Sequence, residues 1–257
     1  IDFVVAGTAN LETFADVYEV FSMPYLFTSE EAYHEVMGDT DYMNQVYAST
    51  DEAGFRVLTW YNAGTRNFYA KTPINTPEDL KGKKIRVQQS PASVDMVNAF
   101  GAAAAPMGFG EVYTAIQQGV IDGAENNELA LTDNGHGDVC KYYSYDMHQM
   151  IPDILIGNMD FLDGLSEEER AIFDEGFELV NQVQREEWGT AVEAAKDRAQ
   201  NEQGVQFLYP DTKPFQEACE PMHQEMLETY PDLAPIYDAI QAYNEQYPTD
   251  TEGGAEQ

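Results

Sequence analysis

The longest uninterrupted helical pattern in the chain begins near Leu165 and sets the scale of the fold. Ser166 is a favourable N-cap, and the glutamates at 167–169 place negative charge at the positive end of the helix dipole. The pattern continues to about Asn201, and roughly 35 residues at 1.5 Å each predict a helix about 50 Å long. Because this length exceeds the width of one small domain, we expect the helix to span two lobes.

Strand and helix patterns alternate in the first half of the chain. In order, they are a helix at 29–53, strands at 55–61 and 66–70, a helix start at Thr76 and Pro77, a strand at 84–88, and helices at 90–100 and 110–118. Strands that alternate with helices at this spacing indicate parallel α/β layers. The sequence therefore predicts an α/β protein.

The two ends of the sequence lead to separate expectations. Residues 1–7 are typical of a buried strand, yet neither a start signal nor a charged and apolar targeting segment precedes them. We therefore expect the native protein to have a beginning that this sequence lacks. The tail at 247–257 is polar and contains a pair of glycines, so we expect it to fray.

Acidic side chains far outnumber basic ones. Of 257 residues, 46 are Asp or Glu and 13 are Lys or Arg, which gives a formal net charge of −33. Such a surface repels phosphate backbones and anionic lipids, which argues against nucleic acids and membrane surfaces as partners. No stretch approaches the roughly 20 apolar residues of a membrane-spanning helix. A solvated, solubilising surface is a sufficient explanation of the acidity.

The few basic residues are concentrated in one part of the chain. None precedes Arg56, and after Arg86 the next is Lys141. The cluster consists of Arg56, Arg66, Lys71, Lys81, Lys83, Lys84 and Arg86. An anionic protein that captures an anion must supply a local positive site, and this stretch is where the sequence offers one. The lysines at 81–84 fit an exposed turn, whereas Arg66 and Arg86 lie in apolar surroundings.

Arg86 is the sharpest candidate for anion binding. Its neighbours Ile85 and Val87 face a core, so Arg86 faces the opposite side, toward the point where the next connection emerges. In open α/β sheets, ligands bind beyond the carboxyl ends of the strands. A guanidinium grips a carboxylate through two parallel hydrogen bonds, which a lysine cannot reproduce. Arg66 follows a glycine-containing turn and offers a second positive fork. Spacing alone leaves the alternative that both arginines pair with surface acids.

Two further features are ambiguous from residue types alone. Glu125, Asn126 and Asn127 form a row of donors and acceptors suited to hydroxyls and carboxylates, or simply a polar loop. Phe109, between two glycines, is either a stacking face or part of the core.

Motifs for cofactors, metals and catalysis are absent from the sequence. The histidines are isolated, and no Cys or His pair has metal-ligand spacing. Phosphate-binding loops, dinucleotide fingerprints and nucleophile elbows are missing, and no Ser or Cys lies beside an evident base. Cys140 and Cys219 either pair or remain buried thiols. We expect no cofactor, no metal and no enzymatic activity.

Three segments together resemble a known family. They are residues 62–66 (NAGTR), 84–87 (KIRV) and 105–126 (APMGFGEVYTAIQQGVIDGAEN). Their order and spacing are similar to those of the extracytoplasmic solute-binding proteins of tripartite ATP-independent periplasmic (TRAP) transporters, the DctP family. The resemblance extends over about residues 2–237, and the motifs are specific in combination.

The resemblance implies a two-lobed, ligand-closing periplasmic-binding-protein fold with a long helix across both lobes, and no catalysis. In the family, the arginine of the second motif anchors the ligand carboxylate, and it corresponds to Arg86. The arginine of the first motif corresponds to Arg66, the asparagine of the third to Asn126, and a ligand-facing aromatic residue to Phe109.

The resemblance also favours one class of ligand. Residues 86–90 (RVQQS), which contain Gln88, and 125–127, which comprise Glu125, Asn126 and Asn127, are similar to the branch that binds sugar acids such as glucuronate or galacturonate. Gly7 stands where the sialic-acid branch tends to have Glu, which disfavours sialate. His148 lies either near the pocket or in the core. Alternatives are a keto acid or dicarboxylate ligand, and an enzyme acting on acidic sugars.

The family pattern gives expectations for lobes and partners. We expect lobe I to comprise 1–62 and 152–190, and lobe II 63–151 and 191–257, with the strand–helix–strand unit that family members carry first missing from lobe I. The expected partners are a small organic acid and the TRAP membrane subunits. The expected protein is a monomer in the periplasm or outside the cell, with lipid anchoring at the missing N-terminus left open.

Overall fold

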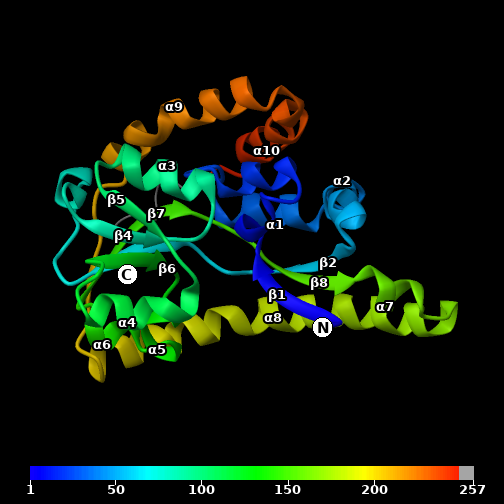
Figure 1. Cartoon of the computed structure of the whole chain (residues 1–257), viewed down its shortest axis with the longest axis horizontal. Helices are drawn as coiled ribbons and strands as arrows, with labels where there is room; N and C mark the ends of the chain where they lie inside the picture. The colour runs from blue at the N-terminus through cyan, green and yellow to red at the C-terminus, as the bar shows by residue number, and fades with distance from the viewer. Residues whose placement is uncertain (249–257) are drawn as a thin grey trace.

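A computed structural model describes residues 1–248 of the chain and contains two β-sheets with helices around them (Figure 1). Most of the tail expected to fray, residues 249–257, lies outside the described residues. The predicted α/β class is confirmed. None of the helices within residues 1–248 combines the length and the apolar character needed to cross a membrane.

The smaller sheet has three strands in the order β1 (Phe3–Gly7), β8 (Asp153–Asn158) and β2 (Phe55–Tyr61). Both outer strands run antiparallel to β8, and Gly7 and Tyr61 each lie opposite Asp153. The prediction of a buried strand at 1–7 is wrong in part, because Val4 and Val5 are 48% and 54% exposed. As a strand at the sheet edge, β1 has a strand neighbour on one side only.

The larger sheet has six strands and is mixed, which corrects the prediction of parallel layers. Its order is β5 (Ala103–Pro106), β4 (Lys84–Val87), β6 (Gly123–Asn126), β3 (Arg66–Ala70), β7 (Tyr142–Gln149) and β9 (Gln206–Leu208). Strand β4 is parallel to β5 and β6, but β3 is antiparallel to β6 and β7. The chain comes from β2 of the smaller sheet into β3, and from β7 it returns to β8 of the smaller sheet. The neighbours β3 and β7 therefore run in opposite directions.

The helix predicted at 29–53 is divided into three short elements. They are α1 (Glu30–Gly38), α2 (Thr40–Tyr47) and the 3-10 helix η3 (Ala48–Ala53). Ser29 caps α1 as expected, and Asp39 caps α2 by accepting a hydrogen bond from the backbone N–H of Tyr42. A side chain that caps a new helix start competes with continuation of the preceding helix, which explains the division at Asp39.

The remaining helices are short, except for those near the C-terminus. They are η1 (Thr8–Leu11), η2 (Asp16–Ser22), η4 (Pro77–Leu80), α3 (Pro91–Ala99), η5 (Phe109–Glu111), α4 (Val112–Gln117), α5 (Leu129–Asp133), α6 (His136–Val139), α7 (Met159–Asp163), α9 (Lys213–Thr229), η6 (Pro231–Leu233) and α10 (Ala234–Gln246).

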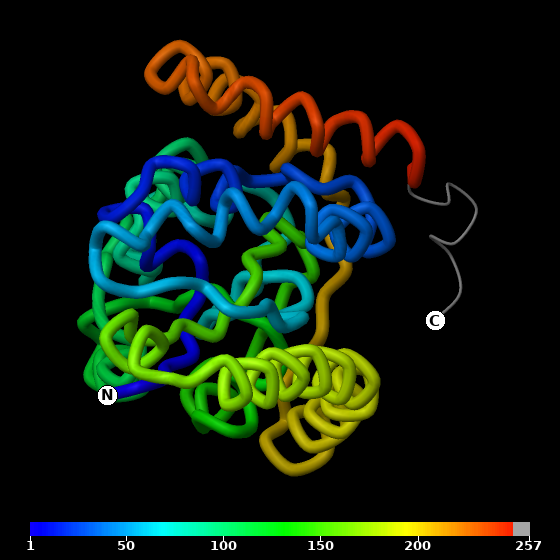
Figure 2. Tube along the Cα trace, turned by 90° about the vertical axis from the view of Figure 1, so that its right-hand side faces the viewer, coloured from blue at the N-terminus to red at the C-terminus, as the bar shows by residue number. Residues whose placement is uncertain are grey.

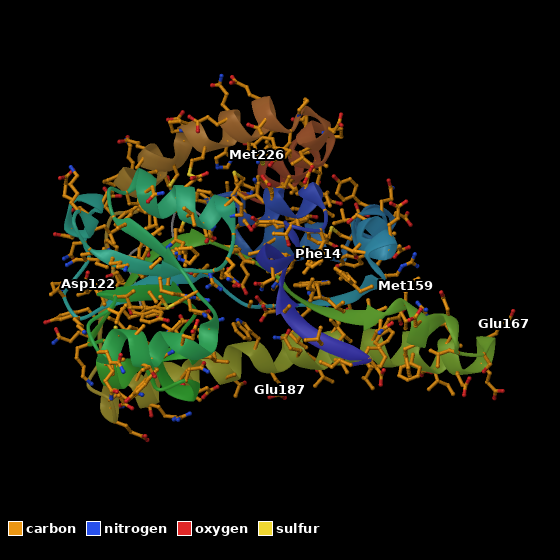
Figure 3. The ribbon with its side chains drawn as sticks, in the orientation of Figure 1. Phe14, Asp122, Met159, Glu167, Glu187 and Met226 are labelled. Atoms are coloured by element: carbon orange, nitrogen blue, oxygen red, sulfur yellow. The ribbon has the colours of Figure 1, made fainter. Side chains whose placement is uncertain are left out.

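The long helix is confirmed as α8 (Glu167–Asn201), which runs beneath both sheets (Figure 1). Ser166 and Glu169 form a reciprocal capping box at its start. Along its length, Asn181 Nδ2 donates to the carbonyl of Trp60, and Gln184 Nε2 to that of Asn62. Glu167 and Glu187 of α8 point away from the sheets in Figure 3.

Helices α9 and α10 cover the side of the molecule opposite α8 (Figures 1 and 2). Phe215 and Cys219 of α9 pack into a core with the larger sheet, whereas Met226 packs with α1, α2 and the smaller sheet (Figure 3). This C-terminal part therefore contacts both halves of the molecule. The division into two lobes at the boundaries given above stays a prediction.

Gly123 controls the spacing between β6 and β3. A Cβ atom added there would lie 2.3 Å from the carbonyl oxygen of Tyr69 and 2.8 Å from Cβ of Ala70. We predict that Gly123→Ala lowers the free energy of unfolding in urea by about 1–3 kcal/mol, as overpacking does. Gly110→Ala is the control, because its added Cβ meets nothing within 4 Å, and its effect is expected to stay within about 0.5 kcal/mol. Equal effects of the two variants would contradict this account of the β3–β6 contact.

Candidate functional site

A cavity of about 310 Å³ lies between the two sheets and gathers most of the predicted site residues. Its lining consists of Val5, Ala6, Gly7, Asn10, Ala63, Arg66, Arg86, Gln88, Gln89, Met107, Gly108, Phe109, Asn126, Asn127 and Asp153. A larger hollow of about 1290 Å³ borders α9, but neither Lys nor Arg lines it. The 310 Å³ cavity, called the arginine cavity below, is lined by both Arg66 and Arg86.

Three adjacent strands of the larger sheet bring the predicted residues together. Strands β4, β6 and β3 are neighbours, with Arg86 near the carboxyl end of β4 and Asn126 at the end of β6. Because β3 runs antiparallel to β6, its first residue Arg66 lies at the same edge of the sheet. Strand β3 thus places a second arginine beside the carboxyl ends of the parallel strands, the ends at which ligands of such sheets bind.

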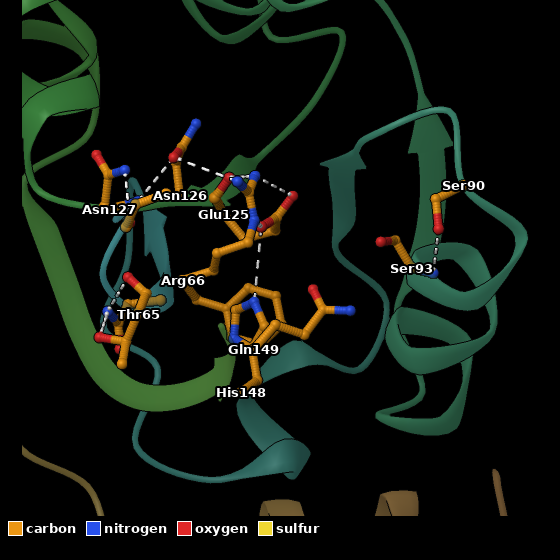
Figure 4. Close-up of polar contacts among 12 residues, drawn as sticks. Thr65, Arg66, Ser90, Ser93, Glu125, Asn126, Asn127, His148 and Gln149 are labelled. Atoms are coloured by element: carbon orange, nitrogen blue, oxygen red, sulfur yellow. Dashed lines mark hydrogen bonds and ion pairs between the residues drawn. The ribbon is translucent and has the colours of Figure 1, made fainter. Parts of the chain in front are cut away.

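Arg66 is already occupied by a buried carboxylate. Its Nε donates to Glu125 Oε2 at 2.5 Å, and its Nη2 lies 3.1 Å from Glu125 Oε1 and from the Glu125 carbonyl oxygen. Its Nη1 reaches Asn126 Oδ1 at 3.4 Å. Figure 4 shows Arg66 extending to Glu125, with His148 next to the same carboxylate. Little of the hydrogen-bonding capacity of Arg66 is left for a ligand.

The Glu125 carboxylate belongs to a chain of alternating charges beneath the cavity wall. His148 Nε2 is 3.6 Å from Glu125 Oε2, and His148 Nδ1 is 2.7 Å from Asp146 Oδ2. Burial alone would raise the pKa of Glu125, but attraction to Arg66 and to the nearby His148 outweighs it and lowers that pKa to about 2. Burial would lower the pKa of His148, but Asp146 and Glu125 raise it to about 9. At neutral pH Arg66 and His148 are therefore positively charged and Glu125 is negatively charged.

Arg86 is buried without a carboxylate partner. Its side chain is 4% exposed, and Nε and Nη2 both donate to the carbonyl of Met107, at 3.1 and 2.9 Å. Its Nη1 is buried and has no hydrogen-bond partner among residues 1–248, and no ion pair there involves Arg86. Burial lowers the pKa of Arg86, yet a guanidinium stays charged in proteins. A buried charge with a free donor is costly unless a ligand completes it.

Phe109 covers the Arg86 guanidinium. The Arg86 Cζ atom lies 5.5 Å from the Phe109 ring centroid, within cation–π range. The ring also makes an edge contact with His136, 5.3 Å between centroids. Burial, with a smaller contribution from Arg86, lowers the pKa of His136 to about 4, so its ring is neutral at pH 7. Phe109 therefore lines the cavity and positions the guanidinium.

The structure separates the predicted site residues into two groups. Arg66, Arg86, Gln88, Phe109, Asn126 and Asn127 line the arginine cavity. Glu125 and His148 are not part of that lining. Both are 0% exposed, Glu125 is bonded to Arg66 and His148 lies close to Glu125, and their contact with a ligand stays a prediction.

Sequence reasoning missed Asp153 and Asn10, which reach the cavity from the smaller sheet and η1. The antiparallel pairing of β1 with β8, which places Asp153 opposite Gly7, is the feature that brings Asp153 there, and no local motif signals it.

The described residues contain no group of three or more His, Cys, Asp or Glu side chains placed to hold a metal ion. Within residues 1–248, Cys140 and Cys219 are both buried free thiols. The arrangement in the arginine cavity suits binding of an organic anion with polar substituents.

Comparisons with known proteins agree with the fold and the cavity. The model of the family described as bacterial extracellular solute-binding protein, family 7, matches residues 1–229. The chain belongs to this family.

A TRAP periplasmic solute-binding protein from Anaerococcus prevotii, solved with bound D-glucuronate, is 60% identical, with a TM-score of 0.94 over 96% of this chain and 80% of that one. One from Xanthobacter autotrophicus, solved with β-D-galacturonate, is 33% identical, with a TM-score of 0.89 over 94% and 80%. The Salmonella typhimurium protein YiiZ is 41% identical over 94% of this chain and 74% of its own. The predicted family and two-lobed fold are confirmed by these neighbours.

The buried His148 predicts a pH dependence of stability. Its folded pKa is raised from about 6.5 to about 9, so its stabilisation is fully present below pH 6.5 and is lost as the pH rises towards 9. We expect the free energy of unfolding in urea to fall by about 2 kcal/mol between pH 7 and pH 9. In His148→Gln this slope is expected to disappear, and an unchanged slope in the variant would exclude a charged His148.

Proposed function

We propose that this protein captures a sugar acid, specifically a hexuronate such as glucuronate or galacturonate, and delivers it to TRAP membrane subunits. The observation that carries the proposal is the unpaired Nη1 of Arg86, a buried guanidinium donor on the wall of the arginine cavity. A ligand carboxylate there would supply the missing partner at low dielectric, where the attraction is strong.

Arg86 rather than Arg66 is the proposed anchor, because their partners differ. Arg66 holds the carboxylate of Glu125 with both its Nε and Nη2 atoms, whereas Arg86 holds only a backbone carbonyl. A ligand carboxylate at Arg66 would have to compete with a buried, ionised side chain. At Arg86 it displaces no charged group.

The neutral polar residues of the cavity support a hydroxylated ligand. Asn126, Asn127, Gln88 and Asn10 each present an amide, which can donate to and accept from hydroxyl groups. Solved relatives with 60% and 33% identity hold glucuronate and galacturonate, acids that combine one carboxylate with several hydroxyls. Both the chemistry of the lining and the relatives' ligands therefore favour hexuronates.

The proposed role is binding and transfer without catalysis. The family consists of extracellular solute-binding proteins. We place the protein in the periplasm as a monomer, as the relatives' names suggest for location. Closing of the two sheets around the cavity would bury the ligand, and opening would release it to the membrane subunits.

Thermal unfolding against a panel of acids tests the proposed ligand. A ligand at about a thousand times its Kd adds roughly 4 kcal/mol, a rise of several degrees in Tm. We expect D-glucuronate and D-galacturonate to raise Tm and keto acids and C4-dicarboxylates to leave it unchanged. A shift with dicarboxylates alone would overturn the hexuronate proposal, and no shift with any acid would overturn the binding function.

Substitution of Arg86 tests the anchor. Loss of one partner of a buried charge pair costs several kcal/mol, so Arg86→Ala should weaken glucuronate binding at least about a hundredfold by calorimetry. Arg86→Lys keeps the positive charge but loses the pair of parallel N–H donors, so we expect it to weaken glucuronate binding about tenfold. Arg170→Ala, which removes an arginine paired with Asp174 on α8, is the matched control and should bind normally. Near-normal affinity in Arg86→Ala would refute the anchoring role.

A further inference from the structure

Asp153 is a carboxylate that the anchoring scheme leaves unused. It is the first residue of β8 and lies opposite Gly7 of β1 and Tyr61 of β2, facing the arginine cavity. Among residues 1–248, no hydrogen bond or ion pair engages its side chain. It is the one acidic side chain in the cavity lining. A carboxylate in a cavity that is proposed to bind a carboxylate ligand needs an explanation.

Gly7 opens the space in which Asp153 meets Gln88. A Cβ atom added to Gly7 would lie 3.1 Å from Gln88 Nε2 and 3.4 Å from Asp153 Oδ1. The two polar side chains therefore converge on the bare face of Gly7, although they come from different sheets. Gln88 Oε1 is also buried and lacks a hydrogen-bond partner within the described part of the chain. The Gln88 atom nearest Gly7 is therefore its amide nitrogen, a donor, and the acceptor at this end of the cavity is the Asp153 carboxylate.

The arginine cavity is thus polarised between the two sheets. The larger sheet supplies Arg66 and Arg86, and the smaller sheet supplies Asp153. Burial raises the pKa of Asp153 by more than attraction to Arg66 lowers it, as expected for a carboxylate without a close partner. A ligand that fits both ends must be anionic at one end and a hydrogen-bond donor at the other.

We propose that Asp153, with Gln88 beside it, forms a hydroxyl-binding end of the cavity and makes the protein select acids with one carboxylate over diacids. The proposal rests on the proposed function, because it takes the ligand carboxylate to lie at Arg86. Ligand hydroxyl groups donate to Asp153, and hydrogen bonds to an ionised acceptor are about twice as strong as neutral ones. A second carboxylate at that end meets a like charge in a buried site and is rejected.

The test compares D-glucuronate with D-glucarate, the open-chain diacid in which C1 is oxidised to a second carboxylate, by calorimetry at pH 7.5. Wild-type protein is expected to bind glucuronate at least about a hundredfold more tightly. Asp153→Asn should weaken glucuronate binding about tenfold and narrow the glucuronate-to-glucarate ratio by about tenfold or more. Asp160→Asn is the matched control, since it removes an exposed carboxylate of α7 and should leave the ratio unchanged.

The outcomes separate this inference from the proposed function. If wild-type protein binds no sugar acid, both fail. If wild-type protein binds glucuronate and Arg86→Ala does not, but Asp153→Asn keeps the wild-type affinity and ratio, only the role of Asp153 is overturned. Equal binding of glucuronate and glucarate by wild-type protein also overturns it, and this result requires no variant to fold.

Monodeoxy analogues of glucuronate add a readout that a merely structural role of Asp153 would not change. At least one analogue should bind wild-type protein about tenfold more weakly than glucuronate, and Asp153→Asn should bind that analogue and glucuronate alike. If every analogue keeps the same penalty in both proteins, no ligand hydroxyl contacts Asp153 and the proposal is wrong.

Discussion

The buried pair of Arg66 and Glu125 is the interaction on which the rest of the site depends. It joins the first residue of β3 to β6, and it uses up one of the two arginines that line the cavity. Removing either partner would leave an uncompensated charge in the interior, which typically costs about 3–5 kcal/mol. His148 and Asp146 extend the pair into a chain with no net charge. The positive character of the cavity therefore comes from Arg86.

The arrangement of the two sheets places Arg86 in a cavity whose two walls differ in charge. The chain passes between the two sheets just before β3 and just after β7, where Arg66 is paired in register with Gln149. The cavity consequently has one wall from the larger sheet, with the basic groups, and one from the smaller sheet, with Asp153. Helix α8 holds the crossing segment through Gln184, which bonds both the N–H and the carbonyl of Asn62. Motion between the sheets would change the distance between the two walls.

Local signals in the sequence predicted those parts that depend on neighbours in the chain. The capping residues and continuous pattern identified α8, and the alternation around Ile85 and Val87 placed Arg86 away from the core. The resemblance to the family grouped Arg66, Arg86 and Asn126. What the sequence could not reveal depends on pairing between distant residues. Arg66 and Glu125 are 59 positions apart, and Asp153 reaches the cavity only through its register with Gly7. The antiparallel direction of β3 likewise has no local signal in the sequence that distinguishes it from a parallel strand.

The most direct test of the account is a crystal structure of the protein with bound D-glucuronate. The account predicts the ligand carboxylate within hydrogen-bond distance of Arg86 Nη1, with the bond between Arg66 Nε and Glu125 retained. A ligand carboxylate bound to Arg66 in place of Glu125, or a ligand turned so that its carboxylate faces away from Arg86, would contradict the central claim. Either result would mean that the unpaired guanidinium does not define the anion site.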